Sequence, residues 1–117
     1  MRHRVKGKKL GRVKRQRTAL MKNLLTSLIL HEHIVTTQAK AKALRPKIEQ
    51  LITIAKKGNL VAKQQLLKAL YNNQVVVKKM LQVIAPRYRE RVGGYVRVIR
   101  KGNRIGDAAP VAIIEFV

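Results

Sequence analysis

The first seventeen residues, MRHRVKGKKLGRVKRQR, most constrain how this chain can fold, because they hold nine Lys or Arg and no carboxylate. Only three large apolar residues lie among them, too few to anchor the segment against a hydrophobic core. The periodic apolar pattern of a folded domain starts only after Arg17. We therefore expect residues 1–17 to form a basic extension and residues 18–117 to form a single domain.

The charge balance of the whole chain favours a polyanionic partner. Lys and Arg number 27 against five Asp and Glu, giving a net charge of +22. Charge of one sign on this scale opposes compactness, and a polyanion relieves that repulsion. Nucleic acid is the leading candidate. An anionic membrane surface is the alternative, but surface-seeking helices are rich in Trp or Phe, and this chain has no Trp and one Phe.

Apolar residues at helical spacing predict four helices, with an aliphatic core because the aromatic fraction is only 3%. The predicted helices follow Thr18, span residues 38–57 and 60–70, and run from Asn73 to a stop at Pro86. Thr18, Thr37 and Asn73 can each cap the helix that follows, since their side-chain oxygens accept from free backbone N–H groups. Pro46 lies inside the second helix, where it removes one hydrogen bond and favours a kink.

Three short segments have the composition of strands: HIVTT (33–37), YVRVIR (95–100) and VAIIEFV (111–117). The last two flank a turn-rich connector and predict an antiparallel hairpin, which HIVTT can join. The predicted fold class is therefore α+β, with a helical cluster packed on one face of a small three-stranded sheet behind the basic extension.

Catalytic and metal chemistry find no support in the sequence. The five carboxylates are scattered, and we expect Asp107 to be a turn residue and Glu115 a strand-face residue. Ser27 is the one serine, and the absence of cysteine excludes disulfides and thiolate sites. The HEH at 31–33 invites a zinc interpretation, but a helix end or packed turn is favoured. Gly93–Gly94 favours a tight turn over a phosphate cradle. We expect no enzyme, no cofactor and no small-molecule substrate.

Clustered Lys and Arg are favoured on a phosphate backbone because they release its counterions. The RNA-contact candidates of the extension are Arg2, His3, Arg4, Lys6, Lys8, Lys9, Arg12, Lys14, Arg15 and Arg17. A solvated flexible tail is the alternative for this segment. Lys22 on the first helix is a further candidate. On the second helix Lys40 is a candidate and shares an angular sector with Lys47, so both could face phosphate, with a solvated face as the alternative.

A second candidate cluster is the segment APRYRERVGGYVRVIR (85–100). Its RNA-contact candidates are Arg87, Tyr88, Arg89, Arg91, Tyr95 and Arg97. Guanidinium groups can fork to phosphates, and tyrosines can stack on unpaired bases. The alternative is that the tyrosines pack in the core while the arginines face water.

Several segments together resemble the bacterial large-subunit ribosomal protein seventeen family. They are the opening MRH, IVTTQAKAKALR (34–45) continuing into EQLITIAKKG (49–58), APRYRERVGGYVRV (85–98) and the ending DAAPVAIIEFV. The family's Thr-Thr motif falls on residues 36–42 and its Arg-x-Gly-Gly-Tyr motif on residues 91–95. The similarity spans nearly the whole chain, in order and at matching spacing.

This resemblance implies a three-stranded mixed sheet and a structural role in the large ribosomal subunit. It implies binding to large-subunit ribosomal RNA near the outer side of the peptide exit region, contact with neighbouring ribosomal proteins, and no membrane association. The expected location is the cytoplasmic ribosome, with an organellar matrix ribosome left open. The alternative function is a general nucleic-acid chaperone or DNA-compacting protein.

Overall fold

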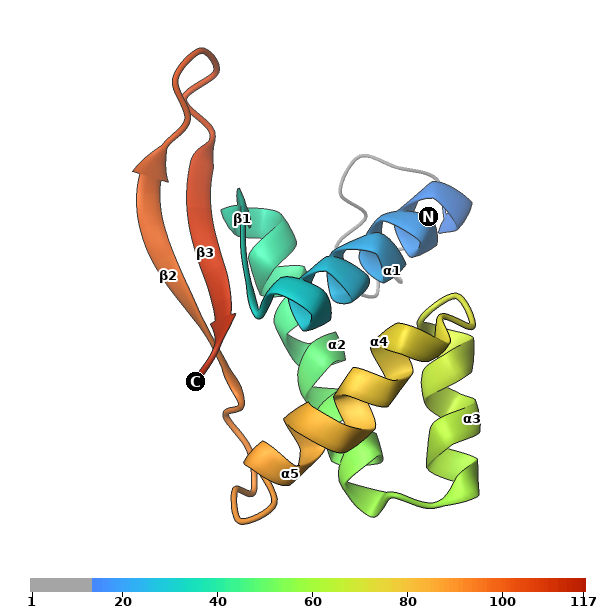
Figure 1. Cartoon of the computed structure of the whole chain (residues 1–117). Coiled ribbons are helices and arrows are strands. Elements are labelled where there is room, and N and C mark those ends of the chain that lie inside the picture. Colours follow the sequence, from blue (N-terminus) through green and yellow to red (C-terminus); the bar gives the residue numbers. More distant parts are fainter. Residues whose placement is uncertain (1–13) are drawn as a thin grey trace, which may run out of the picture.

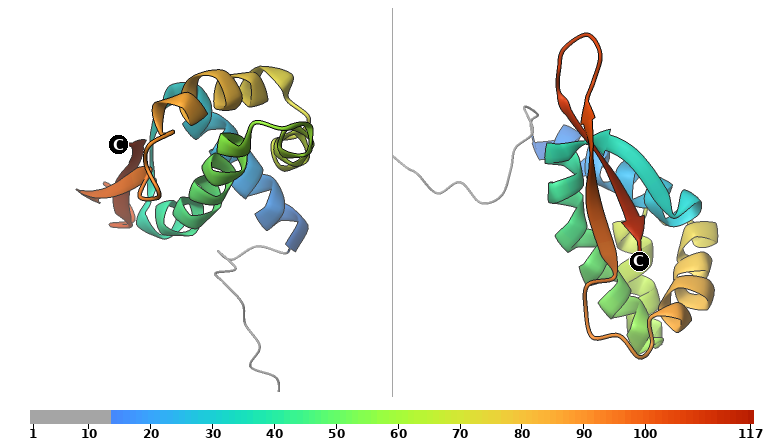
Figure 2. Two further views of the ribbon diagram at one scale, coloured as in Figure 1. Left: turned by 90° about the horizontal axis from the view of Figure 1, so that it is seen from below. Right: turned by 90° about the vertical axis from the view of Figure 1, so that its left-hand side faces the viewer.

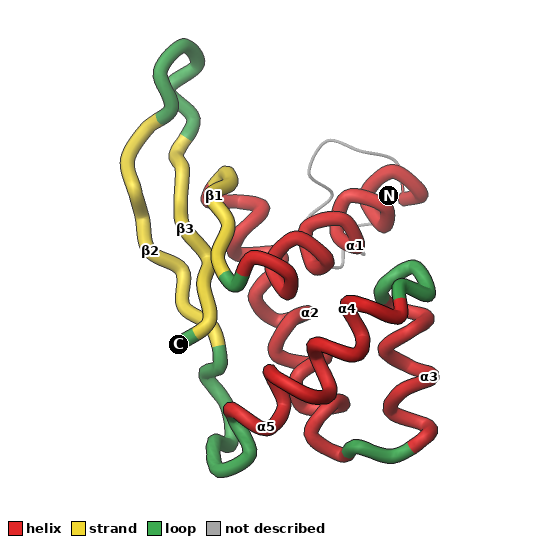
Figure 3. The backbone as a smooth tube through the Cα atoms, in the orientation of Figure 1, coloured by secondary structure: helices red, strands yellow, loops and turns green. Residues whose placement is uncertain are grey.

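The computed structural model describes residues 14–117 and has the predicted α+β fold, with helices beside a three-stranded sheet (Figures 1 and 3). The helical elements are α1 (Lys14–His31), α2 (Gln38–Lys57), α3 (Leu60–Ala69), α4 (Gln74–Lys79), the π-helical segment η1 (Met80–Ile84) and α5 (Ala85–Arg87). The strands are β1 (His33–Thr37), β2 (Val96–Asn103) and β3 (Pro110–Phe116).

The sheet has the order β1-β3-β2, and both pairs are antiparallel. The expectation of a mixed sheet is therefore wrong. The hairpin makes β2 and β3 antiparallel, and β1 runs against β3 along its other edge, with Ile34 opposite Ile114 and Thr37 opposite Val111. Successive side chains of a strand point to opposite faces, and the β3 residues Ala112, Ile114 and Phe116 face the core.

The helices cluster on this buried face of the sheet, with α3 on the side away from the strands (Figures 1 and 2). The long helix α2 contacts all three strands, and its apolar stripe is buried. That stripe consists of Ala41, Leu44, Ile48, Leu51, Ile52 and Ala55. As predicted, the core is mainly aliphatic, and three rings complete it beside the hairpin: Tyr88 lies 5.4 Å from Tyr95 and 6.3 Å from Phe116, centroid to centroid.

Two of the three predicted helix caps are confirmed. Thr37 accepts from the Lys40 N–H at 3.4 Å, and Asn73 accepts from Val75 and Val76 at 3.1 and 3.3 Å. The third prediction is wrong, since α1 begins four residues before Thr18. The Thr18 hydroxyl instead donates to the Lys14 carbonyl at 2.9 Å, as a threonine inside a helix can.

Neither proline ends its helix. Helix α2 continues through Pro46 to Lys57, and the predicted stop at Pro86 is wrong because helical backbone extends to Arg87. The turn before Pro86 widens into a π-helix, in which the Ala85 N–H donates to the Met80 carbonyl, five residues back. Such a widened turn accommodates proline, which has no N–H and whose ring crowds the preceding turn.

Candidate nucleic-acid interface

An open groove of about 810 Å³ runs between α1 and α2. Its apolar surface includes Met21 and Leu25 from α1 and Ala43, Pro46 and Leu51 from α2. Five basic residues also line it: Lys14, Arg17, Lys22, Lys42 and Lys47. Ala69, the last residue of α3, also lines the groove. The groove thus combines an apolar floor with cationic walls.

The helical repeat explains why these residues meet. Residues three and four apart share a helix face, so residues 14, 18 and 22 form one row on α1. Residues 42, 46 and 50 form the corresponding row on α2, and the two rows line the same groove. The adjacent rows are residues 17, 21 and 25 on α1 and residues 43, 47 and 51 on α2. Each of these rows holds one basic residue, Arg17 or Lys47, beside apolar residues that reach the core.

The charged side chains that line the groove are all basic, because no carboxylate is among its lining residues. Lys and Arg can lay their aliphatic stems along an apolar floor while the charged ends remain in water. A concave, low-dielectric surface carrying one sign of charge focuses its field and concentrates counterions. The groove is therefore suited to a phosphate-bearing ligand.

The arginines of the segment 85–100 are in a different electrostatic state. Arg97 donates through Nε to Glu115 at 2.7 Å, and Arg87 pairs with Glu32. The hydrogen bond that Arg87 donates to the Glu32 carboxylate lowers the pKa of Glu32 below its ordinary value, and Lys79 adds to this effect. Burial acts in the opposite direction but is outweighed. Two of the four arginine candidates in this segment are therefore partly neutralised inside the protein, although all four remain exposed.

Tyr88 and Tyr95 lie in the core, so the structure favours the alternative to base stacking for both. They are 4% and 2% exposed. The Tyr88 hydroxyl donates to the Val117 carbonyl at 2.7 Å, and the Tyr95 hydroxyl donates to the Arg91 carbonyl at 3.1 Å. Stacking on RNA would require each ring to leave the core and break its hydrogen bond. A position next to arginines in the sequence does not show that a tyrosine is buried.

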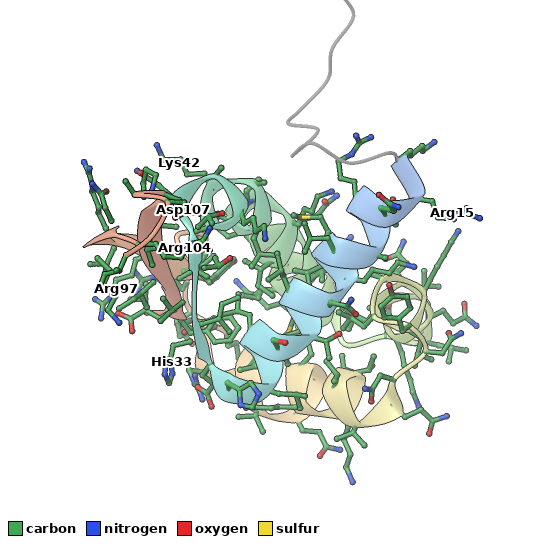
Figure 4. The ribbon with its side chains drawn as sticks, turned by 90° about the horizontal axis from the view of Figure 1, so that it is seen from above. Arg15, His33, Lys42, Arg97, Arg104 and Asp107 are labelled. Carbon is green, nitrogen blue, oxygen red and sulfur yellow. The ribbon has the colours of Figure 1, made fainter. Side chains whose placement is uncertain are left out.

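The remaining candidates separate into groups. Arg2, His3, Arg4, Lys6, Lys8, Lys9 and Arg12 lie outside the described residues. Lys14, Arg17 and Lys22 line the groove, whereas Arg15 and Lys40 do not. Figure 4 shows Arg15 at the start of α1, on the far side of the molecule from Arg97 and Arg104 near the hairpin. The basic residues therefore occupy more than one side of the protein.

Lys42 and Lys47 both line the groove. Lys47 was considered for phosphate contact together with Lys40, whereas Lys42 was not singled out. The selected Lys40 is half-buried in the first turn of α2. Helical periodicity identifies the rows of α2, but only the position of α1 shows which row borders the groove. The sequence held one signal for this row, because Lys42 and Pro46 are four residues apart and lie at the edge of the buried stripe of α2.

The HEH segment is the predicted packed turn. Glu32 adopts a left-handed conformation (φ 66°) between α1 and β1, and its carboxylate pairs with Arg87 and Lys79. Residues 14–117 contain no group of three His, Cys, Asp or Glu side chains placed to hold a metal ion. Within the same residues, no helix combines the length and apolarity needed to cross a bilayer.

None of the remaining carboxylates in residues 14–117 lines the groove. Asp107 is the predicted turn residue, and hydrogen bonds from Arg104 and from the Ala109 N–H lower its pKa to about 2. Figure 4 shows Arg104 and Asp107 together beside the hairpin. Glu115 is the predicted strand-face residue, paired with Arg97.

Comparison with known proteins supports the resemblance seen in the sequence. The family model of ribosomal protein L17 matches residues 20–117. A protein of Orientia tsutsugamushi (strain Boryong), named large ribosomal subunit protein bL17, is 52% identical over 117 residues, which is 100% of this chain and 80% of the relative. Proteins of the same name from Syntrophotalea carbinolica and Trichlorobacter lovleyi are 49% and 48% identical over this whole chain, which covers 75% and 94% of them. The chain therefore belongs to the ribosomal protein L17 family.

Proposed function

We propose that this protein is a constituent of the large ribosomal subunit that binds the subunit's RNA through the groove between α1 and α2. Membership in its family makes it a structural protein and not an enzyme. The relatives are named as large-subunit proteins, and the carboxylate-free cationic groove is the observation that supports RNA as the ligand. Neighbouring proteins of the subunit are further partners under this proposal, and the ribosome in the cytoplasm is the location.

The basic extension is the second part of the proposed RNA surface. Lys14, the first described residue and part of the extension predicted from the sequence, lines the groove. The residues before Lys14 supply six further Lys or Arg and no carboxylate. The exposed arginines 89 and 91 are the third part, while Arg87 and Arg97 contribute after sharing their charge with Glu32 and Glu115.

Salt dependence of RNA binding tests the groove. Each phosphate contact contributes roughly 0.7 to 0.9 to the slope of log affinity against log salt concentration. The double variant Lys42→Gln/Lys47→Gln should therefore reduce the magnitude of the slope by roughly 1.4 to 1.8. The measurement is a binding titration with an in-vitro transcript of large-subunit RNA at several salt concentrations.

The matched control is Lys57→Gln/Lys63→Gln, which removes the same charge from exposed positions outside the groove. If both double variants change the slope equally, only net charge matters and the groove is not the binding surface. The alternative function of a general nucleic-acid chaperone or DNA-compacting protein predicts equal affinity for unrelated duplex DNA. Preference for the large-subunit transcript at equal salt supports the ribosomal role.

A further inference from the structure

Tyr71 is the one exposed aromatic ring of the Phe, Tyr and Trp type in this chain. The chain has three Tyr, one Phe and no Trp, and all four rings lie in the described residues. Tyr88, Tyr95 and Phe116 are buried, whereas Tyr71 is 49% exposed. A chain so poor in aromatic residues therefore presents one ring to solvent.

The ring lies beside the cationic groove. The Lys22 ammonium, which belongs to a residue lining the groove, is 5.0 Å from the centroid of the Tyr71 ring. The Tyr71 hydroxyl donates to the Ala19 carbonyl of α1 at 3.3 Å. Ala69, two residues before Tyr71, also lines the groove. The contacts with Lys22 and the Ala19 carbonyl hold the ring against α1, beside residues that line the groove.

The backbone holds this ring at a position that favours glycine. Tyr71 follows the end of α3 with φ 58°, and the Asn72 N–H donates to the Leu67 carbonyl at 2.7 Å. This is the Schellman arrangement of a helix C-terminus, whose left-handed residue is usually glycine because a Cβ atom is unfavourable there. The chain thus keeps an aromatic side chain where a smaller residue would fit the backbone better.

We propose that Tyr71 stacks on an unpaired nucleobase of the RNA bound in the groove. The ring offers a π-face next to cationic walls that fit the phosphate backbone, and this combination binds single-stranded nucleic acid. Fixing the ring by Lys22 and the Ala19 carbonyl lowers the entropic cost of stacking. The inference rests on the proposed RNA-binding function and adds the class of ligand, a base outside a duplex.

Two variants of Tyr71 test the stacking. Tyr71→Gly removes the ring and suits the left-handed backbone, so the fold should be retained. It should weaken binding to an RNA hairpin with an unpaired loop by roughly tenfold at every salt concentration, because stacking contributes no counterion release. Tyr71→Phe keeps the π-face and should bind within about twofold of the unchanged protein. A fully paired RNA duplex of equal length should show little loss with either variant.

The outcomes separate this inference from the proposed function. Stacking is overturned if Tyr71→Gly binds the loop RNA normally while Lys42→Gln/Lys47→Gln alters the slope, and RNA binding by the groove then stands. Equal loss on loop and duplex, or a loss that Leu60→Ala at the other end of α3 reproduces, also overturns it. If neither Tyr71→Gly nor the groove variant changes binding, the groove function itself fails. A melting curve for each variant confirms that the fold is intact.

Discussion

At the scale of single residues, Glu32 contacts three other elements of the fold. Its carboxylate pairs with Arg87 of α5 and lies 3.3 Å from Lys79 of α4. Its carbonyl accepts from the Phe116 N–H of β3 at 3.1 Å, and Lys79 also donates to the Leu30 carbonyl at 2.9 Å. One residue in the turn between α1 and β1 thus connects the helical layer to the sheet.

Glu32→Gln should lower the free energy of unfolding at neutral pH by about 1 kcal/mol, a small value because the paired side chains are partly exposed. The pKa of Glu32 is lowered in the folded protein. Its contribution is therefore complete above the unfolded pKa and is lost as the pH falls through the folded pKa. Urea unfolding at pH 7 and at pH 3 should show the difference between the two proteins shrinking in acid.

Glu90→Gln is the matched control, because it changes the same charge on an exposed side chain that forms no ion pair within residues 14–117. It should leave stability nearly unchanged at both pH values, or lower it slightly at pH 7 because the net positive charge increases. A loss of stability for Glu32→Gln that is the same at pH 3 and pH 7 would show that the carboxylate charge is not the cause.

Residue roles were the hardest feature to predict from the sequence. Tyr88 and Tyr95 stand next to arginines in the chain, yet folding buries both rings. Tyr71 has no basic residue beside it in the sequence, and Lys22 reaches it from a different helix. Exposure and spatial neighbours depend on how helices pack, and no local pattern records that.

At the scale of elements, local sequence signals were sufficient to predict two of the three proposed helix caps, Thr37 and Asn73. Asn73 was predicted as a cap from its type and position, and its side chain accepts from two N–H groups at the start of α4. By contrast, the start of α1 was placed too late, since the first turn contains no capping signal and is rich in Lys and Arg.

Asn73→Ala should lower the free energy of unfolding by about 1 kcal/mol, because two backbone N–H groups of α4 lose their acceptor. The loss should be reproduced in denaturant unfolding without a change in the denaturant slope. Asn23→Ala is the control, since Asn23 is exposed in the interior of α1 and alanine favours the helix there. Equal effects of the two substitutions would contradict the capping role.

At the scale of the whole molecule, the sequence predicted the α+β class and the hairpin, because both follow from local periodicity and order along the chain. The groove was not predictable, since it exists only where rows of α1 and α2 face each other. The direction of β1 in the sheet was also missed, because strand order and direction are set by packing with α2.

The net charge of +22 makes a further prediction about the whole molecule. Repulsion among like charges opposes folding, and salt shortens its range to about 10 Å at 0.1 M. We therefore expect the melting temperature to rise as NaCl is increased from about 0.02 M to about 0.3 M. A relief of about 1 kcal/mol corresponds to a rise of roughly 4 to 8 °C for a domain of this size.

A variant lacking residues 2–13 provides the matched comparison for this salt effect. The deletion removes six of the 27 Lys and Arg and leaves α1 complete from Lys14. Its melting temperature should rise less with salt, since less repulsion remains to be screened. A melting temperature that falls with salt in both proteins would instead show that internal pairs such as Glu32 with Arg87 outweigh the repulsion of the basic surface. Measuring both proteins by circular dichroism therefore shows whether repulsion among the protein's own basic residues limits its stability. A bound polyanion would relieve the same repulsion.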